Sequence, residues 1–248
     1  MHIGQVAACS GTSEATVTRF VKQMGAESFR SFRESFLTDV HNRRSLPQTQ
    51  GDTLLRYADV QTSDSPQQLC GKVVQSHISA IMQQQQILQH DQIDQAAHAI
   101  YKSGKTLLVG NGRSGLVAAA MDIRLKRLGL ASRLCTDMSN QYISASTAEK
   151  NDVLLAFAKS GRARSIVLSM AMARQRGATT ILVTSDTSSP AARSAEILIP
   201  IVEEPIGYDH SFLTVILMLV SDCIAMRIYA LLNDAEYKKV LRARNRLP

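Results

Sequence analysis

Between residues 106 and 201 the chain alternates short apolar runs with longer amphipathic segments. The runs, each rich in Val, Ile or Leu, are Thr106–Val109, Ser132–Cys135, Val153–Phe157, Thr180–Val183 and Ile197–Ile201. Segments of helical length separate the first four, namely Leu116–Leu128, Ser139–Ala148 and Ser165–Arg176. Short apolar strands that alternate with helices are typical of parallel strands covered on both faces. The pattern therefore predicts an α/β fold with a doubly wound parallel sheet flanked by helices.

Two further apolar segments enclose this region. In Leu69–Tyr101 the apolar residues recur at helical spacing, with a break near His90 that predicts two helices. The stretch Phe212–Leu232 approaches the length of a membrane span, but Asp222 and Arg227 lie inside it and would be costly in lipid. We therefore expect a buried helix and no membrane partner.

The composition is that of a folded protein. A chain of 248 residues with 45% hydrophobic and 20% charged residues can bury one medium domain plus a small appendage. The cysteines lie far apart and form no ligand set, so we expect no metal, no disulfide framework and no cofactor. The residues from Met1 onward lack the basic start and apolar run of a signal peptide. The expected location is the cytoplasm.

The positive charge is concentrated near the middle of the chain. The formal net charge is +7, and the segment 154–185 contains basic residues but no acidic one. These basic residues are Lys159, Arg162, Arg164, Arg174 and Arg176. Lysine and arginine attract phosphates of either nucleic acids or metabolites. The distribution points to an anionic ligand as much as to DNA.

Three zones follow from the patterning. Residues 1–41 are predicted to form a small, partial all-α helix-turn-helix domain. Residues 42–68 are predicted to be a linker, because they are polar and contain Pro47, Gly51 and Pro66. Residues 69–248 form the predicted α/β domain.

The N-terminal residues have the layout of a helix-turn-helix. A first helix carries Val6 and Ala7, a turn of small residues follows, and Ser13 is a good N-cap for a second helix. An apolar face of the second helix contains Val17, Phe20 and Val21. The candidate DNA-binding residues are Ser13, Glu14, Thr16, Thr18, Arg19 and Lys22. An ordinary helical hairpin is the alternative, because Ser-capped helices after glycine turns are common.

Two glycine-containing loops follow predicted strands and open helices. Backbone amides and hydroxyls in such loops can bind an anion, and cations at a helix N-terminus suit a phosphate. The candidate ligand-binding residues are Gly110, Asn111, Gly112, Ser114, Lys159, Ser160, Gly161, Arg162, Thr184, Ser185 and Glu204. The alternative is that the cations form only a solvated surface. The pattern disfavours a dinucleotide site, because the glycine turn matches the dinucleotide fingerprint only loosely and Asp137 is the one acidic residue after the second strand.

The N-terminal motif resembles a known family. The run Gly11–Phe20, followed by Met24-Gly25 and by Phe29–Arg33, is similar to the N-terminal domain of RpiR-type transcriptional regulators. The resemblance implies that the second helix reads operator DNA. Family members carry further helices before this point, whereas Met1 stands almost at the first helix here. The comparison implies either a misassigned start or an incomplete DNA-binding unit.

The region from Leu69 to Leu232 resembles the SIS (sugar isomerase) domain, which implies a sugar-phosphate ligand. The phosphate loop of that family commonly reads Ser-x-Ser-Gly-x-Thr, and its hydroxyls bind the phosphate. Here the matching positions are Ala158, Ser160, Gly161 and Ala163, so two hydroxyls are missing. Lys159 and Arg162 could replace them with charge-assisted contacts, or could signal an altered ligand.

Three functions remain open on the sequence. The first is a regulator that forms a homodimer or homotetramer, binds operator DNA and senses a sugar-phosphate effector. The second is a sugar-phosphate isomerase, which needs a general base; the candidates are Glu203, Glu204 and His210. The third is a sugar-phosphate sensor that does not bind DNA. The helix-turn-helix favours the regulator, without enzyme activity.

Overall fold

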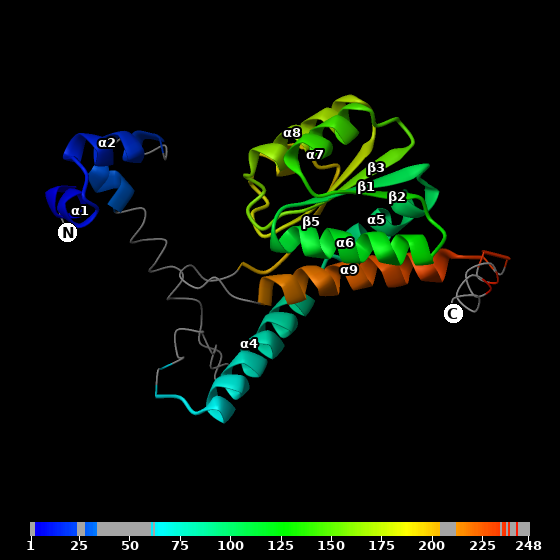
Figure 1. Ribbon diagram of the computed structural model, residues 1–248, viewed down its shortest axis with the longest axis horizontal. Coiled ribbons are helices and arrows are strands. Elements are labelled where there is room, and N and C mark those ends of the chain that lie inside the picture. The colour runs from blue at the N-terminus through cyan, green and yellow to red at the C-terminus, as the bar shows by residue number, and fades with distance from the viewer. Residues whose placement is uncertain are drawn as a thin grey trace. The chain divides into compact units, whose positions relative to one another are not determined.

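The computed structural model describes residues 3–23, 28–33, 61, 63–203 and 212–233, together with 235, 236, 238 and 242 (Figure 1). Most of the predicted linker 42–68, and the site candidates Glu204 and His210, lie outside these residues. The chain forms two compact units, Met1–Thr53 and Leu54–Pro248. Each unit is described by itself below.

The second unit is built on a five-stranded parallel sheet with the strand order β2-β1-β3-β4-β5. The strands are β1 Lys105–Gly110, β2 Ser132–Cys135, β3 Asp152–Phe157, β4 Thr179–Thr184 and β5 Ile197–Pro200. Every strand matches one of the five predicted apolar runs. The predicted doubly wound parallel sheet is confirmed.

The helices also follow the predicted segments, with shifted ends. They are α4 Pro66–Ile87, α5 His90–Lys102, α6 Arg113–Arg127, α7 Met138–Ser146, α8 Arg164–Gln175, the short 3-10 helix η2 Ala192–Ser194, and α9 Phe212–Leu231. Helix α4 starts three residues before the predicted Leu69, because Ser65 and Gln68 form a capping box around Pro66. Periodicity detects the apolar face of a helix but not its cap.

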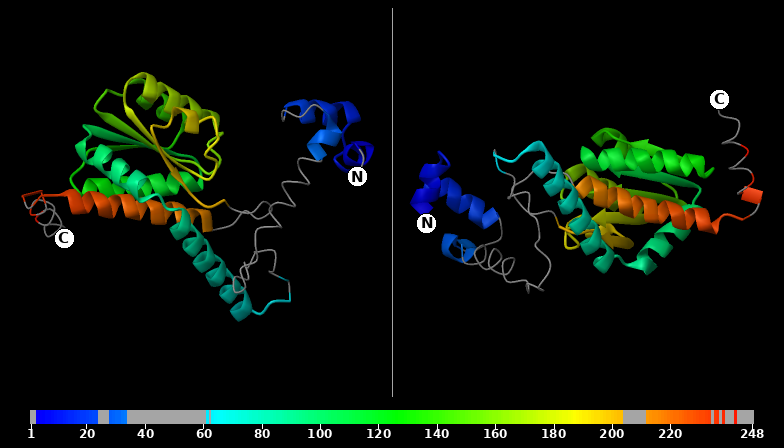
Figure 2. Two further views of the ribbon diagram at one scale, coloured as in Figure 1. Left: turned by 180° about the vertical axis from the view of Figure 1, so that it is seen from behind. Right: turned by 90° about the horizontal axis from the view of Figure 1, so that it is seen from below.

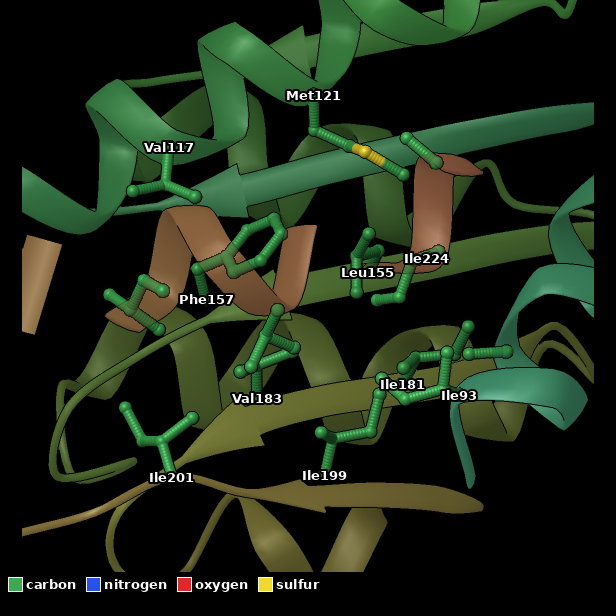
Figure 3. Close-up of a cluster of buried hydrophobic side chains, with 14 of the residues drawn as sticks. Ile93, Val117, Met121, Leu155, Phe157, Ile181, Val183, Ile199, Ile201 and Ile224 are labelled. Carbon is green, nitrogen blue, oxygen red and sulfur yellow. The ribbon is translucent and has the colours of Figure 1, made fainter. Parts of the chain in front are cut away.

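Alternate residues of each strand point to opposite faces of the sheet, and each face has its own core. On one face Leu155 and Phe157 pack with residues of α5, α6 and α9, including Met121 and Ile224 (Figure 3). On the other face Leu154 and its neighbours pack against α7 and α8. Figures 1 and 2 show the resulting three layers, with the sheet between the two helical layers. Full burial of a large apolar side chain stabilises by about 1.5–3 kcal/mol, so both layers are held firmly.

Helix α9 is apolar along most of its length and belongs to the first core. It is the one helix among the described residues that is long and apolar enough to cross a membrane, but buried core helices also satisfy this criterion. Its two charged residues pair with neighbouring helices. Asp222 contacts Arg124 of α6, and Arg227 Nε donates to Asp94 Oδ1 of α5 at 2.5 Å. The predicted buried helix is observed.

The first unit contains α1 Ile3–Cys9, α2 Glu14–Gln23 and a helical turn at residues 29–33. Ala7, Val17 and Val21 form its buried centre, and the rings of Phe20 and Phe32 meet edge-to-face at 6.1 Å. Gly11 has a φ of 64°, which permits the tight turn between the two helices. Helix, turn and capped helix thus occur as predicted, although Phe20 is half exposed rather than buried.

Candidate functional site

The strand order places a switch point between β1 and β3. These neighbouring parallel strands lead into helices on opposite faces, since α6 packs with α9 and α8 packs with α7. In open α/β sheets ligands bind outside the carboxyl ends of strands at such a point. The two predicted loops, after β1 and after β3, both begin here.

The loop after β1 requires glycine. A Cβ atom on Gly110 would lie 2.6 Å from the backbone oxygen of Ser114, so the start of α6 approaches the end of β1 closely. Gly112 has a φ of 54° and is the N-cap of α6. Ser114 is buried in the first turn of that helix. This loop therefore presents backbone amides rather than bulky side chains at the switch point.

The loop after β3 is similar in construction. Gly161 has a φ of 58°, and a Cβ atom there would clash with Ser189 Oγ. Ala163 is the N-cap of α8 and provides no side-chain acceptor, and Gly112 provides none at α6. By contrast, Ser65 caps α4 and Asp137 caps α7. Helix α5 also lacks a side-chain cap at its N-cap residue Gln89, so α6 and α8 are the uncapped helices that start at the switch point.

Arg162 is paired with Asp186, which follows β4. The Arg162 guanidinium donates two hydrogen bonds to Asp186 Oδ2, at 2.7 Å from Nη2 and 3.1 Å from Nε. Asp186 also accepts a hydrogen bond from the Ser188 hydroxyl at 2.7 Å. The Ser188 hydroxyl first, and then Arg162, hold the pKa of Asp186 below its ordinary value. An anion that recruits Arg162 has to compete with this carboxylate.

The hydroxyls after β4 serve the second loop. Thr184 Oγ1 donates to the backbone oxygen of Lys159 at 2.8 Å, and Ser185 Oγ donates to the same oxygen at 3.0 Å. Ser160 Oγ accepts from the backbone amide of Arg162 at 3.4 Å. The structure therefore brings these predicted site residues together, with Thr184 and Ser185 fixing the backbone of Lys159. Glu204 lies outside the described residues.

Two polar residues at this site were not predicted. Gln141 of α7 donates from Nε2 to Asn111 Oδ1 at 2.9 Å, and Asn111 Nδ2 donates to Ser165 Oγ at 3.0 Å. Both Gln141 and Ser165 are buried. The sequence did contain a signal for both residues, since each is a polar residue on the buried face of a predicted helix. Asp137, the acidic residue considered for a dinucleotide site, caps α7 by accepting from the Asn140 amide.

The six candidate DNA-binding residues are all exposed on or beside α2. Ser13 Oγ accepts from the Thr16 amide and lies 2.9 Å from Thr16 Oγ1, so both side chains take part in the cap. Thr18 Oγ1 donates to the backbone oxygen of Glu14 at 2.8 Å. Arg19 and Lys22 are the basic members of the set. The exposed surface of α2 thus combines short hydroxyls with two cations.

Comparison with known proteins supports this description of the sheet and its loops. The family model described as SIS domain matches residues 99–224, which is about half of the chain and covers the sheet with both loops. The chain belongs to the SIS domain family. The predicted SIS fold is confirmed.

Relatives of this SIS protein are named as transcriptional regulators. It is 25% identical over 236 residues to an uncharacterized HTH-type transcriptional regulator of Providencia stuartii, covering 94% of this chain and 81% of the relative. It is 29% identical over 206 residues to the HTH-type transcriptional regulator RpiR of Escherichia coli K12, covering 82% and 67%. The predicted kinship with RpiR-type regulators is confirmed.

Solved structures share the fold. The Vibrio vulnificus NanR protein complexed with ManNAc-6P has a TM-score of 0.68 at 19% identity, covering 99% of this chain and 84% of that one. A phosphoheptose isomerase from Francisella tularensis has a TM-score of 0.56 at 19% identity, covering 67% and 100%. These likenesses concern the fold alone, which regulators and isomerases share.

Proposed function

We propose that this SIS protein is a cytoplasmic, DNA-binding transcriptional regulator that senses a sugar phosphate. The observation that carries the proposal is the presence, in one chain, of a capped helix-turn-helix and an SIS sheet with two uncapped helices at its switch point. A ligand-responsive regulator needs these two components and no catalytic group. The proposal includes self-association, so that two reading helices can bind two half-sites.

The loops after β1 and β3 support a phosphorylated ligand. Amides at the N-termini of α6 and α8 carry partial positive charge and favour anions. Lys159 and Arg162 add two cations to the second loop, where this chain lacks two hydroxyls of the family pattern, and Arg162 is paired with Asp186. ManNAc-6P in the complex of the Vibrio vulnificus protein is a ligand of the chemical class that we propose here.

Helix α2 supports DNA binding through its exposed surface. Arg19 and Lys22 suit phosphates of the DNA backbone, and short side chains in the first turn suit base edges. The relatives named as HTH-type regulators support the same assignment.

An isomerase would need a general base with a pKa near neutrality beside the substrate. Asp186 is the acidic residue at the carboxyl end of β4, and its pKa is lowered, which makes it a weaker base. Glu203 is exposed after β5. The residues described at the switch point therefore favour binding over isomerisation.

The test combines ligand, DNA and turnover measurements on the full chain. A thermal-shift screen against inorganic phosphate and a panel of aldose and ketose phosphates, ManNAc-6P included, should raise the unfolding temperature with at least one compound. At a hundred times its dissociation constant a ligand stabilises by about 2.7 kcal/mol. A gel-shift assay with the upstream promoter should show specific binding. Turnover of the sugar phosphates, or no binding to promoter DNA, would overturn the regulator assignment.

A further inference from the structure

A chain of three hydrogen-bonded polar side chains, two amides and a hydroxyl, crosses the switch point and is here called the amide relay. It consists of Gln141, Asn111 and Ser165 and links α7, the end of β1 and the first turn of α8. Gln141 is fully buried at 0% exposure, and Ser165 is 6% exposed. Besides Asn111 Oδ1, Gln141 Nε2 faces the backbone oxygens of Gly110 at 3.3 Å and Cys135 at 3.2 Å.

The two backbone oxygens fix the direction of every hydrogen bond in the amide relay. A carbonyl oxygen can only accept, so the Gln141 atom that faces Gly110 and Cys135 has to be the NH2 group. The Asn111 atom beside that group then has to be the oxygen, which turns the Asn111 NH2 group toward Ser165. Ser165 Oγ is therefore an acceptor in its bond with Asn111, at 3.0 Å. The amide orientations are assigned from this pattern of donors and acceptors.

As a consequence, the hydrogen of the Ser165 hydroxyl, at the start of α8, has to point away from Asn111. With a lone pair of Ser165 Oγ occupied by Asn111, its hydrogen has no acceptor among the residues that the structure describes. Conversely, Gln141 Oε1 is a buried acceptor that receives no hydrogen bond from the residues that the structure describes. Buried polar groups are normally paired, so an unmet donor beside an uncapped helix N-terminus calls for an acceptor from outside the chain.

We propose that Ser165 is a ligand-binding residue whose hydroxyl donates to an anionic oxygen held at the N-terminus of α8. It supplies a hydroxyl from inside the helix where Ala158 and Ala163 of the loop have none. Gln141 and Asn111 are positioning residues that keep the Ser165 hydrogen directed at the ligand. The inference rests on the proposed function, since it deepens the binding of a phosphorylated ligand at the switch point.

Ser165→Ala tests the direct contact, with inorganic phosphate and ManNAc-6P as probes and the dissociation constant read from the rise in unfolding temperature. A hydrogen bond to a charged oxygen predicts a loss of roughly ten-fold or more in affinity. Ser169→Ala is the matched control. Ser169 lies one turn further along the same face of α8, is fully buried and has no hydrogen-bond partner within the described part of the chain. It should leave the affinity unchanged.

A double-mutant cycle tests the positioning role. Asn111→Ala should weaken binding several-fold in the full chain, because the Ser165 hydroxyl is then free to turn away. In the Ser165→Ala background the same change should cost little, since no directed hydrogen remains. Gln141→Met should follow the same pattern. A merely structural role would instead lower the unfolding temperature and leave the coupling in ligand affinity near zero.

The outcomes separate the inference from the function on which it rests. If the parent protein binds a probe and Ser165→Ala binds equally well, the inference is wrong and the proposed function stands. The inference is also wrong if Ser169→Ala costs as much as Ser165→Ala at equal unfolding temperature. If the parent binds neither probe nor any sugar phosphate, the proposed function fails and the inference fails with it.

Discussion

At the scale of single residues, the ion pair with Asp186 competes with the ligand for Arg162, the cation that we expect to bind the ligand's anionic group. Asp186→Asn removes the competing charge, so we expect phosphate to bind several-fold more tightly. Arg162→Ala should weaken binding by roughly ten-fold and flatten its salt dependence, because a charge-assisted contact is lost. Calorimetric titration at two salt concentrations checks both. Arg127→Ala, an exposed cation at the other end of α6, is the control and should change neither quantity.

The lowered pKa of Asp186 predicts a specific pH dependence of stability. A carboxyl whose pKa is lower in the folded than in the unfolded state stabilises the fold above its ordinary value of 3.8. That stabilisation is lost as the pH falls through the lowered pKa. The difference in unfolding free energy between the parent and Asp186→Asn should therefore be constant from pH 8 to about pH 5 and shrink in more acidic solution. Chemical denaturation across this range is the measurement, and a difference that changes around pH 7 would contradict the assignment.

Arg19 is the residue of α2 expected to hold the DNA backbone. It is exposed, and a cation on a reading helix more often contacts phosphate than bases. Arg19→Ala should weaken binding to specific and random DNA alike, and should reduce the slope of log affinity against log salt by about one. Fluorescence anisotropy over a salt series measures both. Arg133→Ala, an exposed cation on β2, should leave the slope unchanged. An unchanged slope in Arg19→Ala would remove this residue from the interface.

At the scale of elements, α4 and α9 differ in how far their apolar side chains are buried. Helix α9 uses most of its apolar residues in the core of its own chain. Helix α4 is fixed near its C-terminal end, where Gln84 bonds to the backbone of Pro200 and Val202 at 3.1 and 2.9 Å. Along α4 the residues Val74 and Met82 remain 54% and 57% exposed. Of these two helices, α4 therefore carries more of the exposed large apolar side chains.

This face of α4 predicts the contact between two copies of the chain. Val74, Ile78 and Met82 are spaced by four residues and so share one side of the helix. A double change of Ile78→Glu and Met82→Glu should convert the oligomer to a monomer at micromolar concentration, because burying two carboxylates is unfavourable. Light scattering measures the mass. Gln75→Glu adds charge on the same helix at an exposed polar position and should keep the oligomer. A parent protein that is monomeric would rule out this contact.

At the scale of the whole molecule, the proposed regulator has to couple its two compact units. If the sugar phosphate changes the affinity for operator DNA, saturating DNA must change the affinity for the sugar phosphate by the same factor. We expect a factor of about 5–150, the usual range of such coupling. Anisotropy titrations with and without ligand, and calorimetry with and without DNA, give the two factors. Ligand binding and DNA binding that are each tight but independent would identify two functions without regulation.

The sequence by itself determined the class of fold and the position of the loops. Strand and helix periods differ, so the apolar runs at residues 106–201 could be assigned before any contact was known. Glycines such as Gly110 and Gly161 marked the turns, since only they fit a close approach or a positive φ. Ser13 could likewise be placed at the start of α2 from its type and position alone.

Only the tertiary structure decided which side chains of the site face one another. Arg162 meets Asp186 across 24 residues of sequence, and Asn111 meets Ser165 across 54. These pairs depend on the order of strands in the sheet, which no local pattern encodes. Gln141 looked like an ordinary polar residue of a helix, and its role follows only from the carbonyls that surround it. Local preferences act over a few residues, whereas the polarity of a buried hydrogen bond is set by whichever groups the fold brings within about 3 Å.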